Sequence, residues 1–153
     1  MEKKQAVNDL VTRLVEGTTY QMLEAAQAAG EHGGDAVGPI AALISSADRE
    51  TRWRAAVALE RIGAPAVEAL VSAAASEDYL VRVPAIWALE HIGDPRGMDV
   101  LYTNLEGENE TCRWMAAAAL SRIGGDQGRT AVDRAFADDP TGRGIVEELI
   151  EGS

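Results

Sequence analysis

The sequence predicts an all-α fold, a right-handed α-α superhelix (solenoid) of about five helical hairpins. The prediction rests first on three near copies of one 13-residue segment: TRWRAAVALERIG (51–63), VRVPAIWALEHIG (81–93) and CRWMAAAALSRIG (112–124). Each copy carries apolar residues at the spacing of one helix face. Each also follows an Asp or Asn and ends in Gly, the residue types that begin and end helices. A repeat period of about 30 residues is typical of stacked helical hairpins.

The aligned copies define the face that each helix buries. Positions 55, 58, 59 and 62 recur at i, i+3, i+4 and i+7, so they lie on one side of a helix. The shared columns are Ala55/Ala85/Ala116, Ala58/Ala88/Ala119, Leu59/Leu89/Leu120, Ile62/Ile92/Ile123 and Gly63/Gly93/Gly124. Because the buried columns are mostly small or branched apolar residues, we expect closely packed amphipathic helices.

Shorter apolar segments lie between the copies and predict the first helix of each hairpin. Pro65 and Pro95 begin two of them, where a first helical turn tolerates proline. We expect one repeat domain over residues 1–153, with degenerate pairs at both ends. The expected pairs are 2–33, 34–63, 64–93, 94–124 and 125–153. One hairpin cannot bury its apolar stripe alone, so neighbouring hairpins are expected to stack.

Composition restricts the function. The 153-residue chain has a formal net charge of -11, which disfavours binding to nucleic acid because phosphates would be repelled. No apolar stretch reaches the roughly 20 residues that a membrane helix needs, and no signal peptide is recognisable, so we expect a cytoplasmic protein. The single cysteine, Cys112, excludes an internal disulfide.

The pattern D-x-x-x-R-x-x-A-x-x-A-L-x-x-I-G, followed by Asp-Pro or Ala-Pro, resembles HEAT repeats. It is most similar to the short HEAT-like type that also occurs in phycobilisome lyases, and the resemblance covers residues 34–139 well. It implies that the second helices line the concave side of the solenoid. It also implies that acidic and arginine columns form a ladder through the stack: Asp48 and Arg52, Asp78 and Arg82, Asn109 and Arg113, Asp139 and Arg143.

Positions that vary among the second helices predict a partner-binding groove. They form an apolar row with arginines beside it, the composition of a protein-binding surface. The predicted residues are Arg54, Val57, Arg61, Trp87, His91, Met115, Ala118 and Arg122. We expect another protein as the partner, presenting an apolar segment with some acidic character. Two alternatives stay open: Trp87 fills a gap left by the alanines, or the arginines neutralise glutamates on their own helices. Pro84 inside one second helix predicts a possible kink beside Trp87.

No catalytic, metal-binding or cofactor-binding residue is predicted. Cys112 occupies the column of Thr51 and Val81, as expected for an inert, semi-buried side chain. His32 and His91 lie two pairs apart, too far to share a metal. The sequence therefore favours a non-catalytic protein–protein interaction scaffold. The alternative implied by the resemblance is a lyase-like subunit that acts on a bilin-carrying (tetrapyrrole) protein together with a partner.

Overall fold

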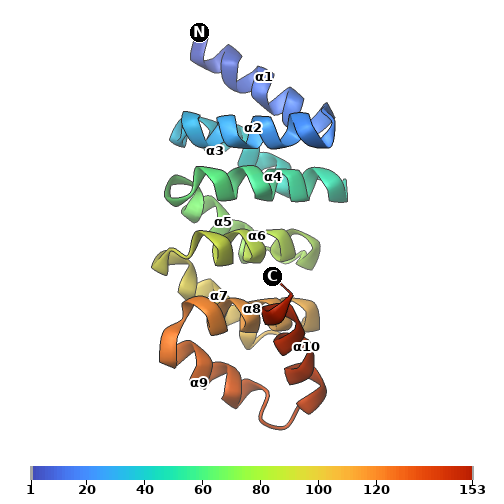
Figure 1. Ribbon diagram of the computed structural model, residues 1–153, viewed down its shortest axis with the longest axis vertical. Helices are drawn as coiled ribbons and strands as arrows, with labels where there is room; N and C mark the ends of the chain where they lie inside the picture. The colour runs from blue at the N-terminus through green and yellow to red at the C-terminus, as the bar shows by residue number, and fades with distance from the viewer. Residues whose placement is uncertain (1, 153) are drawn as a thin grey trace.

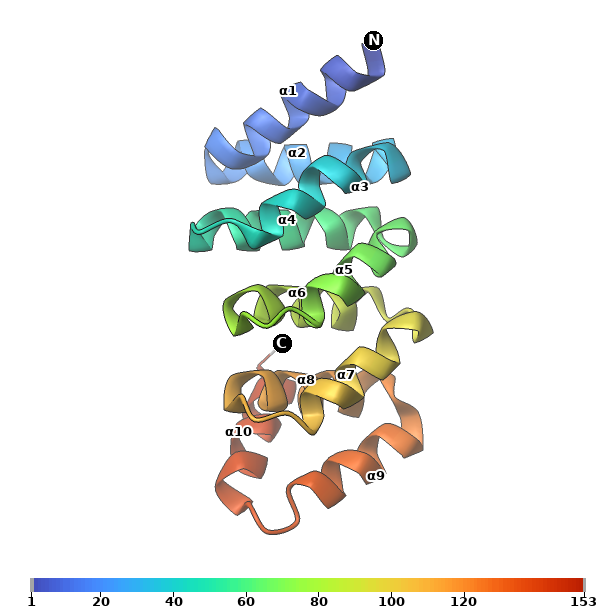
Figure 2. The ribbon, with the colours of Figure 1, turned by 180° about the vertical axis from the view of Figure 1, so that it is seen from behind.

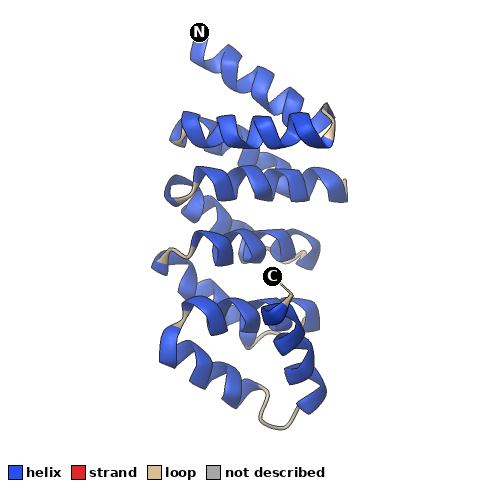
Figure 3. Cartoon of the chain, viewed as in Figure 1, coloured by secondary structure: helices blue, strands red, loops and turns tan. Residues whose placement is uncertain are grey.

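The computed structural model describes residues 2–152, and this part of the chain contains helices but no strand (Figures 1 and 3). Three short 3-10 helices, η1 (Ala42–Ser45), η2 (Ala64–Ala66) and η3 (Pro95–Gly97), lie between some of the α-helices. The α-helices are α1 (Glu2–Glu16), α2 (Thr19–His32), α3 (Gly34–Ala41), α4 (Arg49–Ile62), α5 (Val67–Ala74), α6 (Tyr79–Ile92), α7 (Met98–Leu105), α8 (Glu110–Ile123), α9 (Gly125–Ala135) and α10 (Pro140–Glu151).

The helices form two layers that follow the order of the chain. Figure 1 shows α2, α4, α6 and α8 stacked as one layer, and Figure 2 shows α1, α3, α5 and α7 on the opposite side. Within the first layer α2 packs on α4, α4 on α6, and α6 on α8. Stacked hairpins in chain order are the predicted α-solenoid, which the structure confirms.

The predicted caps begin and end the second helices. The side chain of Asp48 accepts a hydrogen bond from Thr51 N (3.0 Å), and that of Asn109 accepts one from Cys112 N (3.0 Å). Each bond satisfies a backbone donor that has no partner inside its helix. At the other end of α4, Gly63 has a φ of 79°, which suits glycine because it has no Cβ. The predicted start and stop signals therefore operate as expected.

Two members of the arginine column, Arg52 and Arg113, contact backbone carbonyls rather than the capping residues. Within residues 2–152 no ion pair joins Asp48 to Arg52, Asp78 to Arg82 or Asp139 to Arg143. Buried Arg52 donates from Nη1 to Ser46 O (2.9 Å), just beyond the end of η1. Arg113 donates to Leu105 O at the end of α7 (3.2 Å) and lies over the Phe136 ring. These two arginines tie the second helix to the end of the first.

Two other members of the column have different surroundings. Arg143 forms ion pairs with Asp133 on α9 and with Glu147 on its own helix, the latter at 3.8 Å. The Arg82 guanidinium lies beside the Cys112 thiol, and its Nε is buried without a hydrogen-bond partner. The four arginines thus recur at one position of the repeat, but their side chains make different contacts.

Pro84 is fully buried inside α6. The helix runs from Tyr79 to Ile92 without a break in its assignment. A buried proline at this point loses one backbone hydrogen bond but fills space against neighbouring helices. Pro84 therefore belongs to the packed interior and not to the groove surface.

The C-terminal hairpin departs from the others. Helices α9 and α10 each pack on α8, while their contact with one another is slight. Figure 1 shows the end of α10 in front of α8, and Figure 2 shows it behind α8. Helix α10 therefore lies on the same side of α8 as the predicted groove.

Candidate protein-binding groove

Trp87 lies at the centre of the groove, on the exposed side of α6. Its ring is half-buried and makes an edge contact with Trp53 of α4, at a centroid distance of 6.0 Å and an interplanar angle of 75°. On its other side it packs against His91, with centroids 4.5 Å apart and an angle of 31°. His91 Nδ1 lies 2.8 Å from Trp87 O, so its N–H can donate to that carbonyl. Trp87 is held from two sides but keeps an exposed face.

Two hollows meet at the Trp87–His91 pair. We call the first the N-terminal hollow; it measures about 460 Å³ and is lined by Leu23, Val57, Glu60, Arg61, Trp87 and His91. We call the second the C-terminal hollow; it measures about 110 Å³ and is lined by Trp87, Glu90, His91, Met115, Ala118 and Leu149. The structure thus brings together six of the eight predicted residues around one aromatic pair.

Charged groups border the C-terminal hollow. Glu90 is largely buried, and its two carboxylate oxygens lie 3.6 Å from Arg122 Nε and 3.7 Å from His91 Nδ1. Burial raises the pKa of the Glu90 carboxyl, and the nearby Arg122 and His91 oppose that rise only in part. A carboxyl group that is costly to ionise therefore lies beside the aromatic pair.

Arg54, although predicted to bind a partner, is engaged with the first hairpin. Its side chain is 11% exposed. Nη1 donates to Leu14 O (3.0 Å) and Gly17 O (2.7 Å), which lie at and just beyond the end of α1. Helix ends leave carbonyls without partners, and a cation there also meets the negative end of the helix dipole. Arg54 therefore fastens α1 to α4, and we leave it out of the proposed binding surface.

Four residues that line the hollows were not among the predicted set: Leu23, Glu60, Glu90 and Leu149. Leu23 and Leu149 are large apolar side chains that stay 45% and 40% exposed. Glu90 precedes His91 and shares the column of Glu60, so the repeat alignment alone could have placed it near the groove. Leu149 gave no such signal, because the unusual course of α10 brings it there. The predicted row Val57–Trp87–Met115–Ala118 is accordingly covered by α10 at its C-terminal end.

Outside the two hollows, the described residues give little evidence for a reactive thiol, a metal site or a membrane-spanning helix. Cys112 is buried, and desolvation raises the pKa of its thiol, which disfavours the reactive thiolate. Among residues 2–152, no three His, Cys, Asp or Glu side chains form a group able to hold a metal ion. Over the same range, no helix is both long enough and apolar enough to span a bilayer.

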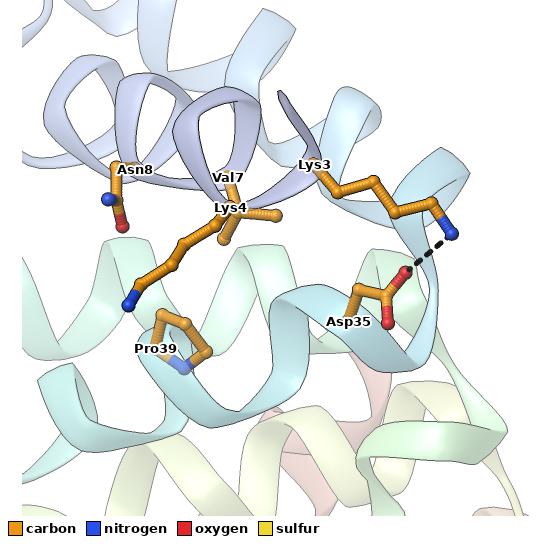
Figure 4. A pocket seen from close by; sticks show the side chains of 6 residues that line it. All are labelled: Lys3, Lys4, Val7, Asn8, Asp35 and Pro39. Carbon is orange, nitrogen blue, oxygen red and sulfur yellow. Dashed lines mark ion pairs between the residues drawn. The ribbon is translucent and has the colours of Figure 1, made fainter. Parts of the chain in front are cut away.

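A separate hollow of about 290 Å³ lies between α1 and α3 (Figure 4). Its lining residues are Lys3, Lys4, Val7, Asn8, Asp35 and Pro39. Lys3 Nζ is 3.8 Å from Asp35 Oδ2, and the Lys3 side chain is 85% exposed. A loose, solvated ion pair of this kind contributes little binding energy, so we place no site here.

A stack of helical hairpins in chain order places the protein in the class of α-solenoid repeat proteins. Comparison with known proteins identifies the family. The family model for HEAT repeats matches residues 67–150, more than half of the chain. The chain therefore belongs to the HEAT-repeat family. The model for the PBS lyase HEAT-like repeat matches residues 51–76, which include most of α4. No curated protein matches the sequence.

Among solved structures, the fold resembles a chain of the complex of CpcE and CpcF of phycocyanin lyase from Nostoc sp. PCC7120. The superposition has a TM-score of 0.69 and covers 97% of this chain and 99% of that chain. The sequence identity is 18%, so the likeness concerns the fold. The predicted resemblance to short HEAT-like repeats is confirmed.

Proposed function

We propose that this chain is one subunit of a lyase-like assembly that binds a partner protein and acts with it on a tetrapyrrole-carrying protein. The observation that carries the proposal is the match, over almost the full length of both chains, to a chain from a complex of two phycocyanin lyase subunits. The PBS lyase HEAT-like match over residues 51–76 supports it, because that segment supplies Val57 and Arg61. These comparisons favour the lyase-like alternative over the plain scaffold that the sequence favoured.

The groove has features that suit a flat, conjugated ligand with carboxylate arms. The exposed face of Trp87 and the His91 ring provide an aromatic surface between the two hollows. Arg61, whose side chain is 53% exposed, lies in one hollow, and Arg122 borders the other. Aromatic faces stack on conjugated rings, and guanidinium groups pair with carboxylates. A tetrapyrrole lying across Trp87 would have the Arg61 cation on one side, while Arg122 on the other side is engaged with Glu90 and Ile150 O.

The direct test is a spectroscopic titration of the purified protein with biliverdin, an open-chain tetrapyrrole. We expect a saturable change in its visible absorbance, and a roughly tenfold weaker affinity in Trp87→Ala because the stacking surface is lost. Tyr20→Ala is the matched control, since Tyr20 is an aromatic residue of α2 that is 71% exposed and lines neither hollow. Far-UV circular dichroism checks that both variants stay folded.

A non-catalytic scaffold is the second candidate, supported by the apolar, arginine-bordered composition of the groove. It predicts that Trp87→Ala abolishes capture of a protein partner while biliverdin leaves no spectral trace. Binding of neither biliverdin nor a protein through the groove would exclude both functions. Arg54→Glu is unsuitable for this test, because Arg54 secures α1.

A further inference from the structure

One wall of the C-terminal hollow is formed by a helix end, and that helix belongs to the chain itself. Leu149, in the last turn of α10, lies in the hollow with Trp87, Met115 and Ala118. Arg122 of α8 donates from Nη2 to Ile150 O in the same turn. The last carbonyls of a helix have no partner within it and carry partial negative charge. Arg122 therefore satisfies the end of α10 while Leu149 lines the apolar hollow.

Helix α10 is also held by core packing, because Val146 belongs to the buried core and Ile150 packs against it. Of the residues of α10, only Gly142 and Val146 are buried, and Leu149 stays 40% exposed. The helix packs mainly on α8 and only slightly on α9. The Leu149 and Arg122 contacts thus add to this core packing in fixing the end of α10 over the groove.

The N-terminal hollow offers a related set of side chains on the other side of the Trp87–His91 pair, where α4 takes the place of α8. Arg61 occupies the position in α4 that Arg122 occupies in α8, each at the same distance from its N-cap residue. Val57 corresponds likewise to Ala118, and both hollows share the Trp87–His91 pair. Leu23 adds an apolar wall that is 45% exposed.

The two hollows differ in size. The N-terminal hollow measures about 460 Å³, against about 110 Å³ for the one that Leu149 lines. The Arg61 guanidinium pairs only loosely, at 3.4 Å, with the adjacent Glu60. The N-terminal hollow is therefore a larger counterpart of the C-terminal hollow beside α10.

We propose that the N-terminal hollow binds the C-terminal end of a helix from the partner protein. An apolar side chain of that helix lies against Trp87, Val57 and Leu23, and its last carbonyls accept hydrogen bonds from Arg61, as Ile150 O does from Arg122. This inference rests on the proposed function, because it names what the partner presents to the groove. The partner helix and the tetrapyrrole both use Trp87 and Arg61, so they bind there in turn and not together. A helix end is the occupant because an arginine of the same repeat position, beside the same aromatic pair, holds a helix end within this chain.

The test uses the intact protein and a synthetic helix of known sequence. The probe is a peptide of residues 138–152 with an amidated C-terminus and an N-terminal fluorescein, stapled between the positions of Arg143 and Glu147 to keep it helical. We expect saturable binding by fluorescence anisotropy, and a roughly tenfold loss of affinity in Arg61→Gln because a charge-assisted hydrogen bond is removed. Arg49→Gln is the matched control: Arg49 is an exposed arginine at the other end of α4 and loses the same charge.

Three outcomes would overturn the inference. The first is an absence of binding to the wild-type protein. The second is equal affinity in Arg61→Gln and wild type. The third is weakening by Arg122→Gln but not by Arg61→Gln, which would mean that the peptide only displaces α10. If the peptide experiment fails while Trp87→Ala still weakens biliverdin binding, the helix-end inference falls and the proposed function stands.

Discussion

At the scale of single residues, the capping side chains determine where the second helices begin. Asp48 accepts hydrogen bonds from both the backbone N–H (3.0 Å) and the hydroxyl (2.7 Å) of Thr51. These bonds favour the ionised form and hold the pKa of Asp48 below its ordinary value. Asn109 makes the equivalent backbone contact without a titratable group. The two caps therefore differ in one property, their dependence on pH.

A comparison of Asp48→Ala with Asn109→Ala separates the effect of the capping hydrogen bond from the effect of the carboxylate charge. The Asp48 carboxylate stabilises the fold fully above its ordinary pKa of 3.8, and this contribution is lost as the pH falls through its lower, folded-state pKa. We therefore expect the cost of Asp48→Ala to shrink in acid. Asn109→Ala should cost about 1 kcal/mol at every pH. Urea unfolding at neutral and acidic pH measures both, and an equal pH trend in the two variants would contradict the account.

Glu90 is expected to destabilise the fold when ionised. Burial raises its pKa, so the protonated form is favoured in the folded state. The stabilising contribution of the protonated Glu90 carboxyl is present below the ordinary pKa of 4.5 and is lost as the pH rises through the folded-state pKa. Glu90→Gln should therefore raise the Tm at pH 7 and change it little in acid. Glu148→Gln, on the exposed side of α10, controls for the reduced net charge. A lower Tm for Glu90→Gln at pH 7 would show that its ion pairs outweigh desolvation.

At the scale of helices, a glycine allows the close approach of α2 and α4 that shapes the groove. A Cβ added to Gly30 would lie 2.8 Å from Arg61 O, at the base of the N-terminal hollow. Real Cβ atoms do not approach backbone that closely, so α2 would have to move. Gly144 of α10, in contrast, has no atom within 4 Å of such a Cβ.

Gly30→Ala and Gly144→Ala should change stability in opposite directions. We expect Gly30→Ala to destabilise by about 1–3 kcal/mol through overpacking. Gly144→Ala should stabilise by roughly 0.5–1 kcal/mol, because alanine favours a helix interior over glycine. Chemical denaturation with circular dichroism measures both. Equal effects of the two substitutions would mean that the α2–α4 approach is not tight.

Arg54 is expected to control the attachment of α1. Arg54→Gln removes charge-assisted bonds to the last carbonyls of α1, at a cost of about 1–3 kcal/mol. Hydrogen exchange of α1 amides should accelerate while exchange in α6 and α8 stays unchanged. Arg13→Gln, which changes an exposed arginine near the end of α1, is the control. Unchanged α1 exchange in Arg54→Gln would contradict the role of Arg54 as a fastener.

At the scale of the whole molecule, periodicity predicted the stacking but not the contacts between distant hairpins. Columns such as Leu59/Leu89/Leu120 and the caps at Asp48 and Asn109 are local signals, and the structure confirms the helices that they predict. The Arg54 contact with Leu14 joins residues 40 positions apart, which no repeat column records. The approach of Leu149 to Trp87 depends on how α10 turns across α8.

The central claim is that stacked second helices present one binding groove centred on Trp87. Site-specific photo-crosslinking tests it most directly, with p-benzoylphenylalanine placed at Val57 in the groove or at Thr103, which is exposed on α7 of the opposite layer. The account predicts partner adducts from the Val57 position, abolished by Trp87→Ala, and none from the Thr103 position. Adducts from Thr103 but not from Val57 would contradict it.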